Sequence, residues 1–239
     1  MNTMTAERHQ DWEGCYNARD LGGLKRRGGG ETRWGTTFRS DNPERLTEAA
    51  WARVHGLGIR TVIDLRGAYE VKPDGRAEDI TSLNIVMDDE TDREFWDHWN
   101  GTMLSGTPLY YQAFLDRFPE RIGEICTAVA RAEPGGVLFH CAAGRDRTGL
   151  IALILLALVD VEPEEIAADH GLSADRLRPA WAELNLDDQT ATIERLIAAE
   201  NTTARESILS AVAGLDPVKY LRNAGLTSED IDSLRARLI

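Results

Sequence analysis

The stretch Val137–Gly149, with the sequence VLFHCAAGRDRTG, decides the fold that this chain is expected to adopt. Its first three residues are apolar and follow a Pro-Gly-Gly turn signal at 134–136, a pattern typical of a short strand covered on both faces. Residues 149–159 are apolar all round, which predicts a buried helix. The loop 140–148 therefore lies at the carboxyl end of a strand and the start of a helix, where open α/β sheets bind ligands.

On either side of this stretch, strand and helix signals alternate before the sequence becomes helical throughout. The expected elements are a hairpin within Thr32–Arg39, a helix from Thr47 to Gly56 or Gly58, strands at Arg60–Arg66 and Leu83–Met87, a long surface loop or short irregular helix at 89–106, a helix from Tyr110 to Ala132, and amphipathic helices from about Glu162 onward. This order predicts a single α/β domain over residues 1–239, with a central parallel-rich sheet flanked by helices and a helical C-terminal half.

The charge of the chain excludes some classes of partner. Forty acidic residues against 27 basic ones give a formal net charge of -13, which argues against nucleic acid or an anionic membrane surface. The three cysteines are far apart and indicate neither a disulfide framework nor paired zinc ligands. The polar start predicts no signal peptide, and no apolar run reaches the roughly 20 residues that span a bilayer. We therefore expect a cytoplasmic protein. Export by a route that needs no signal peptide is the alternative.

The loop carries a candidate nucleophile and a cation at a spacing that suits phosphate binding. Five residues separate Cys141 from Arg147, a length that can curl into a concave nest of backbone N–H groups as wide as a phosphate. Arg147 would close the nest with a planar fork for two phosphate oxygens, and an arginine at a helix start opposes the helix dipole unless an anion is present. These surroundings should lower the pKa of the Cys141 thiol and prepare it for in-line attack on phosphorus.

The other loop residues suit the same chemistry. Ala142, Ala143 and Gly144 leave the backbone free to approach a bound phosphate, and Thr148 could donate a hydrogen bond to the sulfur and ease its departure. The predicted reaction is hydrolysis of a phosphate monoester with inorganic phosphate as a product.

The pattern His140-Cys-x5-Arg-Thr-Gly149 resembles the phosphate loop of the protein-tyrosine-phosphatase superfamily. The fuller HCAAGRDRTG is similar to the bacterial branch whose loop reads HCxxGKDRTG. Further matches to that branch are Asn17–Gly23 (NARDLGG), the pair Arg39 and Ser40, Asp64–Glu70 (DLRGAYE) and Tyr220–Leu226 (YLRNAGL). The resemblance covers most of the chain and implies a tyrosine phosphatase that works through a phosphocysteine intermediate without metal or cofactor.

The substrate implied by the resemblance is phosphotyrosine on protein. Dual-specificity action and phosphoinositide headgroups are the alternatives. The lysine that is usual inside the family's loop is Arg145 here, so a planar fork replaces a compact ammonium and substrate preference is the property affected.

The general acid has two candidates. The resemblance favours Asp146, whose alternative role is a loop carboxylate paired with its arginine neighbours. Many superfamily members carry the acid on a loop about thirty residues before the cysteine, where this sequence has no aspartate. Asp97 and Asp116 lie on either side of that region at less fitting distances, and Asp97 is the rival. His140 is expected to orient the loop from outside.

Several charged residues are expected near the same sheet edge. Asp64 and Arg66 end a predicted strand and either contact the substrate or form an ion pair with Arg19 or Arg39. Arg19 and Asp20, in a glycine-flanked turn, are expected to brace the site from outside.

Two further possibilities concern class and access. A rhodanese-like sulfurtransferase and a non-catalytic phosphate-binding module also use such loops, but the five-residue spacer and the Arg-Thr-Gly ending argue against them. Segment 173–200, expected as helices 173–186 and 188–200, is either fixed scaffold or a mobile helical lid, and the resemblance makes the lid worth proposing.

Overall fold

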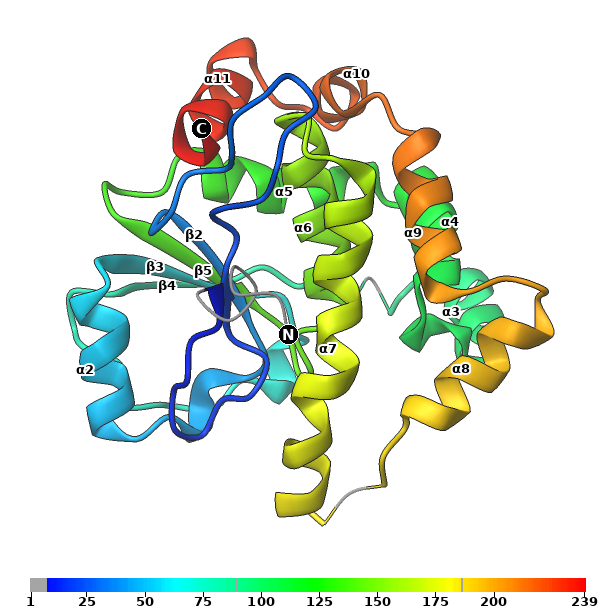
Figure 1. Cartoon of the computed structure of the whole chain (residues 1–239), viewed down its shortest axis with the longest axis horizontal. Coiled ribbons are helices and arrows are strands. Elements are labelled where there is room, and N and C mark those ends of the chain that lie inside the picture. The colour runs from blue at the N-terminus through cyan, green and yellow to red at the C-terminus, as the bar shows by residue number, and fades with distance from the viewer. Residues whose placement is uncertain (1–7, 89, 186) are drawn as a thin grey trace.

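Five strands form one sheet whose order is β1-β2-β5-β3-β4 (Figure 1). The strands are β1 (Arg19–Asp20), β2 (Thr37–Ser40), β3 (Ile59–Asp64), β4 (Thr81–Asn84) and β5 (Gly136–His140). We obtained this fold as a computed structural model, which describes residues 8–88, 90–185 and 187–239. Residues 1–7 of the predicted domain, residue 89 of the predicted irregular segment and residue 186 of the predicted lid lie outside the described residues.

The last residues of the parallel strands lie in register across the sheet. Ser40 pairs with His140, His140 with Asp64, and Asp64 with Asn84. Only β1 runs antiparallel, paired with β2. The segments that follow these strand ends therefore leave the sheet at one common edge, and the loop after His140 starts in the middle of that edge.

Helices cover both faces of this sheet, as predicted, and form the C-terminal half (Figure 1). The α-helices are α2 (Glu48–Gly56), α3 (Arg93–Gly101), α4 (Tyr111–Arg117), α5 (Pro119–Ala130), α6 (Asp146–Leu158), α7 (Pro163–Glu183), α8 (Thr190–Ala199), α9 (Ala204–Ala213), α10 (Pro217–Asn223) and α11 (Ser228–Leu238). Short 3-10 turns are η1 (Pro43–Arg45), η2 (Ala68–Glu70), η3 (Leu104–Gly106) and η4 (Pro108–Tyr110). Within the described residues, no helix is long and apolar enough to cross a membrane.

Two apolar cores lie on opposite faces of the sheet because side chains alternate along β5. Val137 and Phe139 belong to the larger core beneath α5 and α6, whereas Leu138 belongs to the smaller core beneath α2. Every residue of β5 is buried, and nearly all of α6 is buried as well. The prediction of a doubly covered strand followed by a buried helix is thus confirmed.

Several predicted elements differ in their extent, among them the strand expected at 83–87, which lies at Thr81–Asn84. The helix expected over 110–132 breaks at Phe118, because the residue before a proline is pushed out of helical geometry and Pro119 starts α5. The helix expected from residue 173 is the second half of α7, which begins at Pro163. The segment 89–106, expected as a surface loop or a short irregular helix, contains the regular helix α3, whose start is capped by the side chain of Asp92.

Candidate active site

The loop after β5 has its carbonyl groups turned outward. Each carbonyl from residue 141 to 145 has a polar partner outside the loop or on its rim. The contacts are Cys141 O with His140 Nδ1 (3.3 Å), Ala142 O with Asn42 N (3.0 Å), Ala143 O with Asn17 Nδ2 (2.9 Å), Gly144 O with Asn17 Nδ2 (3.2 Å) and Arg39 Nη2 (2.7 Å), and Arg145 O with Arg39 Nη2 (3.3 Å).

This arrangement turns the backbone N–H groups inward. In a trans peptide the N–H points opposite to the C=O, so the N–H groups of residues 142–146 face the inside of the loop. The N–H of Gly144 donates to Cys141 Sγ at 3.2 Å, which places the thiol within that concave surface. The first turn of α6 has no side-chain cap, so its free N–H groups add to the same anion site.

Gly144 is required by the path of the loop. Its φ is +64°, in the left-handed region that favours glycine, and a Cβ there would lie 2.2 Å from Ser40 O. The loop thus packs directly against the end of β2.

A buried ionic cluster lies behind the loop. Asp169 of α7 accepts hydrogen bonds from Arg8, from Arg19 Nε at 3.0 Å and from Arg39 Nη1 at 2.7 Å, and all four side chains are almost fully buried. Burial alone would raise the pKa of Asp169, but the three guanidinium groups hold it well below its usual value. Three cations around one anion leave an excess of positive charge behind the site, which favours a bound anion in front of it.

The predicted bracing residues act through this cluster. Arg19 Nη1 donates to Asn17 Oδ1 at 2.6 Å, and Asn17 in turn holds the loop carbonyls. Burial, together with Arg39, lowers the pKa of Arg19 to about 9, so it is still charged at neutral pH. Asp20 accepts hydrogen bonds from the N–H groups of Gly22 (2.8 Å) and Gly35 (2.7 Å). It therefore fixes the turns at these two glycines and does not contact the phosphate loop.

Arg147 stands between two carboxylates. Its Nη1 lies 3.4 Å from Glu70 Oε1 and 3.3 Å from Asp88 Oδ2. Burial would lower the pKa of Arg147, but the facing Cys141, Asp88 and Glu70 together raise it above its usual value. The guanidinium is thus permanently charged and held at the loop.

Sequence analysis missed Asp88. Burial, opposed by Arg147 and reinforced by Glu70 and Glu90, raises the pKa of Asp88 to about 6. Residues 85–87 run along the end of β3, with Ile85 N donating to Asp64 O at 2.9 Å, and they deliver Asp88 to the sheet edge. The signal was present, because Asp88 is the first residue after the strand expected at 83–87.

Arg145 and Asp146 form a pair with each other. Arg145 Nη2 lies 3.0 Å from Asp146 Oδ2, and its Nε donates to the same carboxylate at 3.1 and 3.2 Å. Arg145 Nη2 also donates to Gly106 O at 3.3 Å. The rival candidate Asp97 lies on α3 with a side chain that is 72% exposed, and its ion partner is Arg93 on the same helix.

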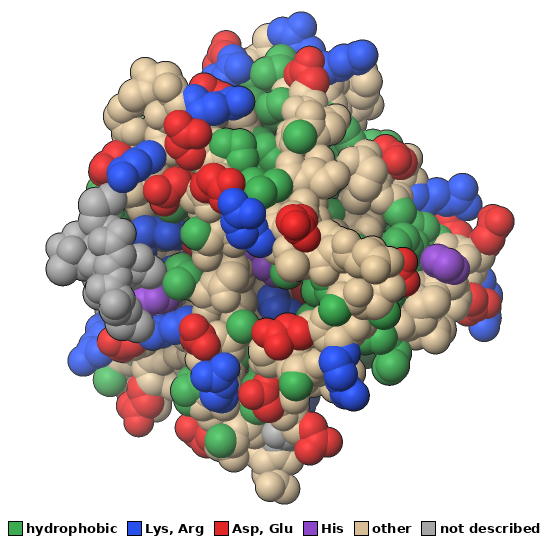
Figure 2. Space-filling model, turned by 45° about the vertical axis from the view of Figure 1, so that its right-hand side comes forward, with side chains coloured by type: hydrophobic (Ala, Val, Ile, Leu, Met, Phe, Trp, Pro, Cys, Tyr) green, Lys and Arg blue, Asp and Glu red, His purple; other side chains and the backbone are tan. Residues whose placement is uncertain are grey.

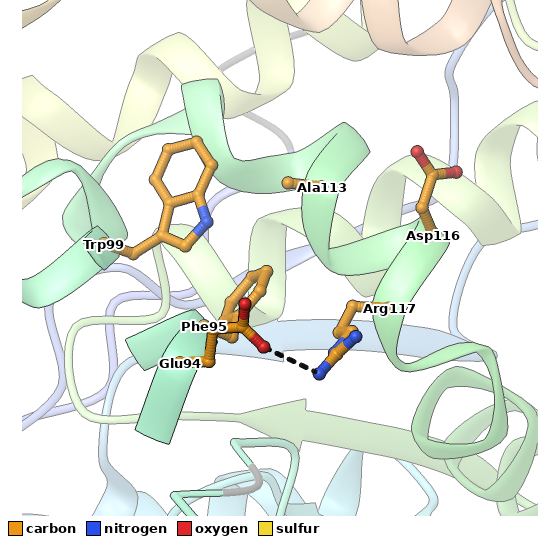
Figure 3. A pocket seen from close by; sticks show the side chains of 6 residues that line it. All are labelled: Glu94, Phe95, Trp99, Ala113, Asp116 and Arg117. Atoms are coloured by element: carbon orange, nitrogen blue, oxygen red, sulfur yellow. Dashed lines mark ion pairs between the residues drawn. The ribbon is translucent and has the colours of Figure 1, made fainter. Parts of the chain in front are cut away.

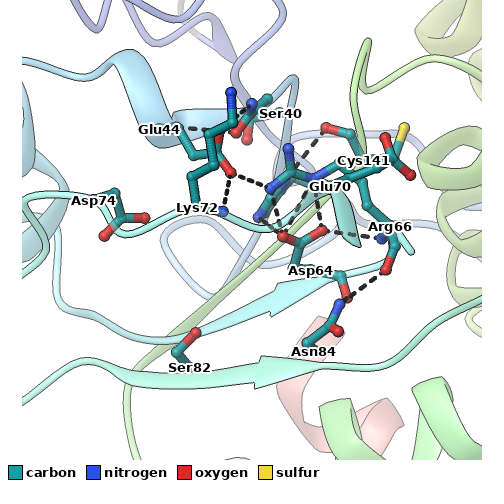
Figure 4. Close-up of polar contacts among 12 residues, drawn as sticks. Ser40, Glu44, Asp64, Arg66, Glu70, Lys72, Asp74, Ser82, Asn84 and Cys141 are labelled. Carbon is teal, nitrogen blue, oxygen red and sulfur yellow. Dashed lines mark hydrogen bonds and ion pairs between the residues drawn. The ribbon is translucent and has the colours of Figure 1, made fainter. Parts of the chain in front are cut away.

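Arg66 pairs with Asp64 and with Glu44, and neither Asp64 nor Arg66 pairs with Arg19 or Arg39 (Figure 4). Arg66 Nη2 lies 2.7 Å from Asp64 Oδ2 and 2.6 Å from Glu44 Oε1. Although burial would raise it, these bonds hold the pKa of Asp64 below its usual value. The ion pair expected with Arg19 or Arg39 is therefore not found among the described residues, because the chain turns back on itself immediately after β3 and brings Arg66 to Asp64.

His140 and Thr148 are fully buried beside the loop. Burial lowers the pKa of His140 to about 4, so at neutral pH the ring is uncharged and does not act as a cationic acid. Thr148 Oγ1 has no hydrogen-bond partner among the described residues, including Cys141. The hydroxyl is therefore available to form a hydrogen bond with a group that binds in the nest.

A surface pocket of about 430 Å³ lies elsewhere, between α3 and α4 (Figure 3). Phe95, Trp99 and the ion pair of Glu94 with Arg117 line it, and none of its lining residues belongs to the phosphate loop. Trp96 is buried in the larger core.

Acidic and basic side chains alternate over the face drawn in Figure 2, where a cationic side chain lies at the floor of a central hollow. No three His, Cys, Asp or Glu residues of the described chain could hold a metal ion together.

A cysteine thiol inside a nest of N–H groups, closed by an arginine at a helix start, defines the cysteine-dependent phosphatases. The model of the tyrosine phosphatase family matches residues 10–239 of the chain. The chain therefore belongs to the tyrosine phosphatase family, whose members hydrolyse phosphate monoesters.

Three relatives show the breadth of the similarity. A protein of Cupriavidus necator that is assigned by name to the tyrosine-protein phosphatases is 34% identical over 64% of this chain, and the match spans 59% of that relative's length. The tyrosine-protein phosphatase of Nostoc commune is 27% identical over 81% of the chain and 71% of its own length. The triple specificity protein phosphatase PtpB of Mycobacterium tuberculosis is 26% identical over 95% of the chain and 97% of its own length.

Proposed function

We propose that this chain hydrolyses phosphotyrosine on protein through a phosphocysteine intermediate on Cys141. The observation that carries the proposal is the nest: inward N–H groups of residues 142–146, a thiol among them and Arg147 at the rim. The N–H groups and guanidinium would bind the equatorial oxygens of the phosphoryl group, where charge must be stabilised in the transition state.

The first step forms the phosphorus–sulfur bond and breaks the ester bond between phosphorus and oxygen. The Cys141 thiolate supplies the electron pair, and the leaving oxygen takes a proton from Asp146 as the alcohol departs. In the second step a water attacks phosphorus and gives its proton to the Asp146 carboxylate. The phosphorus–sulfur bond breaks, inorganic phosphate leaves and the thiolate is restored, and we propose that Thr148 then donates a hydrogen bond to the sulfur.

Asp146 is preferred to Asp97 as the acid because it stands on the loop itself, whereas Asp97 lies exposed on α3. Its pairing with Arg145 must loosen for it to carry a proton, and substrate binding is the event that we expect to loosen it. Asp88 is a second carboxyl at the site and touches Arg147 instead of the loop end.

A single phosphate on an uncharged alcohol suits the site better than a multiply phosphorylated headgroup. Each arginine at the sheet edge already has a carboxylate partner: Arg66 has Asp64 and Glu44, Arg145 has Asp146, and Arg147 has Glu70 and Asp88. Arg66 in particular is held by two carboxylates and is not available for a second phosphate. Phosphoinositide and dual-specificity action are therefore secondary proposals.

A substrate panel tests the proposal. Phosphotyrosine, phosphoserine and phosphothreonine peptides and phosphoinositides are assayed in parallel with wild type and Cys141→Ser in the presence of a chelator. We expect the highest kcat/KM for phosphotyrosine peptides and none of the activity in the variant. A preference for phosphoinositides would contradict the substrate assignment, and sulfur transfer from thiosulfate without phosphatase activity would contradict the reaction.

A further inference from the structure

Tyr111 is a buried residue beside the phosphate loop that the proposed reaction does not yet involve. It is the first residue of α4, and its side chain is fully buried in the larger core. Its hydroxyl donates a hydrogen bond to the backbone carbonyl of Asp146 at 2.8 Å. Burial, reinforced by the nearby Asp146 carboxylate, raises the pKa of Tyr111 well above its ordinary value, so the hydroxyl keeps the proton that it donates.

The space for this hydroxyl depends on Gly149, in the first turn of α6. A Cβ at position 149 would lie 2.5 Å from Tyr111 Oη, so a larger residue there would displace the hydroxyl. The tyrosine ring is held by edge-to-face contacts with Tyr110 (ring centroids 5.3 Å apart) and His170 (6.2 Å apart). The hydroxyl therefore occupies a fixed position against the start of α6.

The bond from Tyr111 completes a set of contacts that surround Asp146. The peptide group before Asp146 is held by Arg39, whose Nη2 donates to Arg145 O at 3.3 Å, and the peptide group after it is held by Tyr111. Because peptide groups are planar, fixing both of them fixes the direction in which the Asp146 side chain leaves the backbone. The carboxylate is paired with Arg145, whose Nη2 also donates to Gly106 O at 3.3 Å.

We propose that Tyr111 is a positioning residue for proton transfer, because its hydroxyl holds Asp146 in the orientation from which the carboxyl reaches the leaving oxygen. This inference rests on the proposed function, in which Asp146 is the general acid. Residues 105–111 contain no carboxyl group of their own, so this segment acts through the loop residue that it holds. A general acid works only within hydrogen-bond reach of the oxygen that it protonates, so a small displacement of Asp146 lowers the rate.

The test measures kcat/KM of wild type and Tyr111→Phe for a phosphotyrosine peptide and for p-nitrophenyl phosphate. The substitution removes one hydroxyl and keeps the ring. It should lower kcat/KM for the peptide about 3- to 10-fold, the effect of one hydrogen bond. The value for the nitrophenyl ester should stay within about twofold, because an activated leaving group needs little protonation. The inhibition constant of inorganic phosphate should also stay within about twofold, since the nest is unchanged.

A double-mutant cycle shows whether Tyr111 acts through the acid. Asp146→Asn and the double variant are assayed with the same two substrates. In the Asp146→Asn background, Tyr111→Phe should have no further effect on the peptide, because the group that it positions is already removed. A merely structural role of Tyr111 would give the same loss in both backgrounds.

Two further variants complete the design. Tyr220→Phe is the matched control, because the hydroxyl of Tyr220 in α10 donates to Leu115 O at 3.0 Å and so holds a backbone carbonyl of α4 instead of the loop. It should keep wild-type kinetics with both substrates. Gly149→Ala, which crowds the Tyr111 hydroxyl, should reproduce the selective loss and serves if Tyr111→Phe does not fold.

The outcomes separate the positioning role from the proposed reaction. An equal loss for both substrates, or a loss that adds fully to that of Asp146→Asn, would overturn the role of Tyr111. A loss for the peptide in Asp146→Asn with none in Tyr111→Phe would remove this inference and keep Asp146 as the acid. Wild-type kinetics in Asp146→Asn would remove Asp146 from the proposed function and overturn this inference with it.

Discussion

Arg147 is the residue on which most charges of the site converge. It faces the Cys141 thiol and contacts Glu70 and Asp88. A substrate phosphate must therefore share this guanidinium with carboxylates that are already there. The affinity of the site for oxyanions therefore depends on whether those carboxylates are protonated.

Asp88 should make that affinity depend on pH. Its pKa is raised to about 6 by burial and by Glu70, Glu90 and Asp146, against the opposing effect of Arg147. Between pH 5 and 7 it loses its proton and competes with an anion for the guanidinium. The affinity for sulfate, whose charge is constant in this range, should fall as pH rises, and the fall should be smaller in Asp88→Asn. Identical pH profiles of the two proteins in a sulfate titration would contradict this role.

The proposed general acid gives a second prediction at this scale. Asp146→Asn should lower kcat by about 10²–10⁴-fold, the range for a positioned acid, with a larger loss for tyrosine than for activated nitrophenol leaving groups. Asp97→Asn is the control and should behave as wild type, because that carboxylate is exposed on α3. Steady-state kinetics over a series of leaving groups measures both. A large loss of kcat in Asp97→Asn with little loss in Asp146→Asn would instead identify Asp97, on α3, as the general acid.

At the scale of elements, the sequence predicted what short-range patterns control. The doubly apolar strand, the all-round apolar helix and the cap at Thr47 follow from local periodicity and propensity, and β5, α6 and α2 agree with them. The register of Ser40, His140, Asp64 and Asn84 depends on pairing between distant strands and was not predictable. For the same reason Asp88 was missed, although its position after a strand was visible.

Arg66 and Asp169 illustrate the same limit within the site. The partner of Asp64 was expected among arginines distant in sequence, yet a tight turn after β3 gives it Arg66. Asp169 had no motif around it, and only the packing of α7 behind the loop gives it three arginine partners.

The two helices of the predicted lid segment differ in how firmly they are anchored to the rest of the fold. Residues 173–183 belong to α7 and are anchored, since Ser173 accepts from Arg19 at 3.2 Å and Leu177 is buried. In α8 only Ile197 is buried. The segment that we propose as a lid is therefore α8 with its flanking turns.

Hydrogen exchange should distinguish these helices. Residues 190–199 should exchange faster than α6 and slow when vanadate occupies the site, while residues 173–183 should be protected throughout. The measurement is exchange mass spectrometry with and without vanadate. Protection of 190–199 equal to that of α6, and unchanged by vanadate, would reduce α8 to fixed scaffold.

At the scale of the molecule, an acidic protein maintains a local anion site. The chain carries a net charge of -13, yet three arginines are buried around Asp169 directly behind the loop. These arginines come from the N-terminal segment and from β1 and β2, and their shared carboxylate comes from α7. The cluster therefore links the N-terminal segment and α7 to the phosphate loop.

Removing the shared carboxylate should destabilise the whole fold. Asp169→Ala leaves three buried guanidinium groups without their anion, a change that typically costs about 3–5 kcal/mol. Asp232→Ala, which removes an exposed partner of Arg235, should have an effect within about 0.5 kcal/mol. Urea unfolding of both variants measures the difference. Equal stability of the two would show that the cluster contributes nothing to folding.

The central claim is that Cys141 carries the phosphoryl group during turnover. Wild type and Cys141→Ser are mixed with a phosphotyrosine peptide, quenched in acid within the first turnover and digested for mass spectrometry. We predict one added phosphoryl group on the peptide that contains Cys141 in the wild type, and neither adduct nor more than a few per cent of the turnover in the variant. Substantial turnover by Cys141→Ser, or wild-type turnover with the adduct on another residue, would contradict the account.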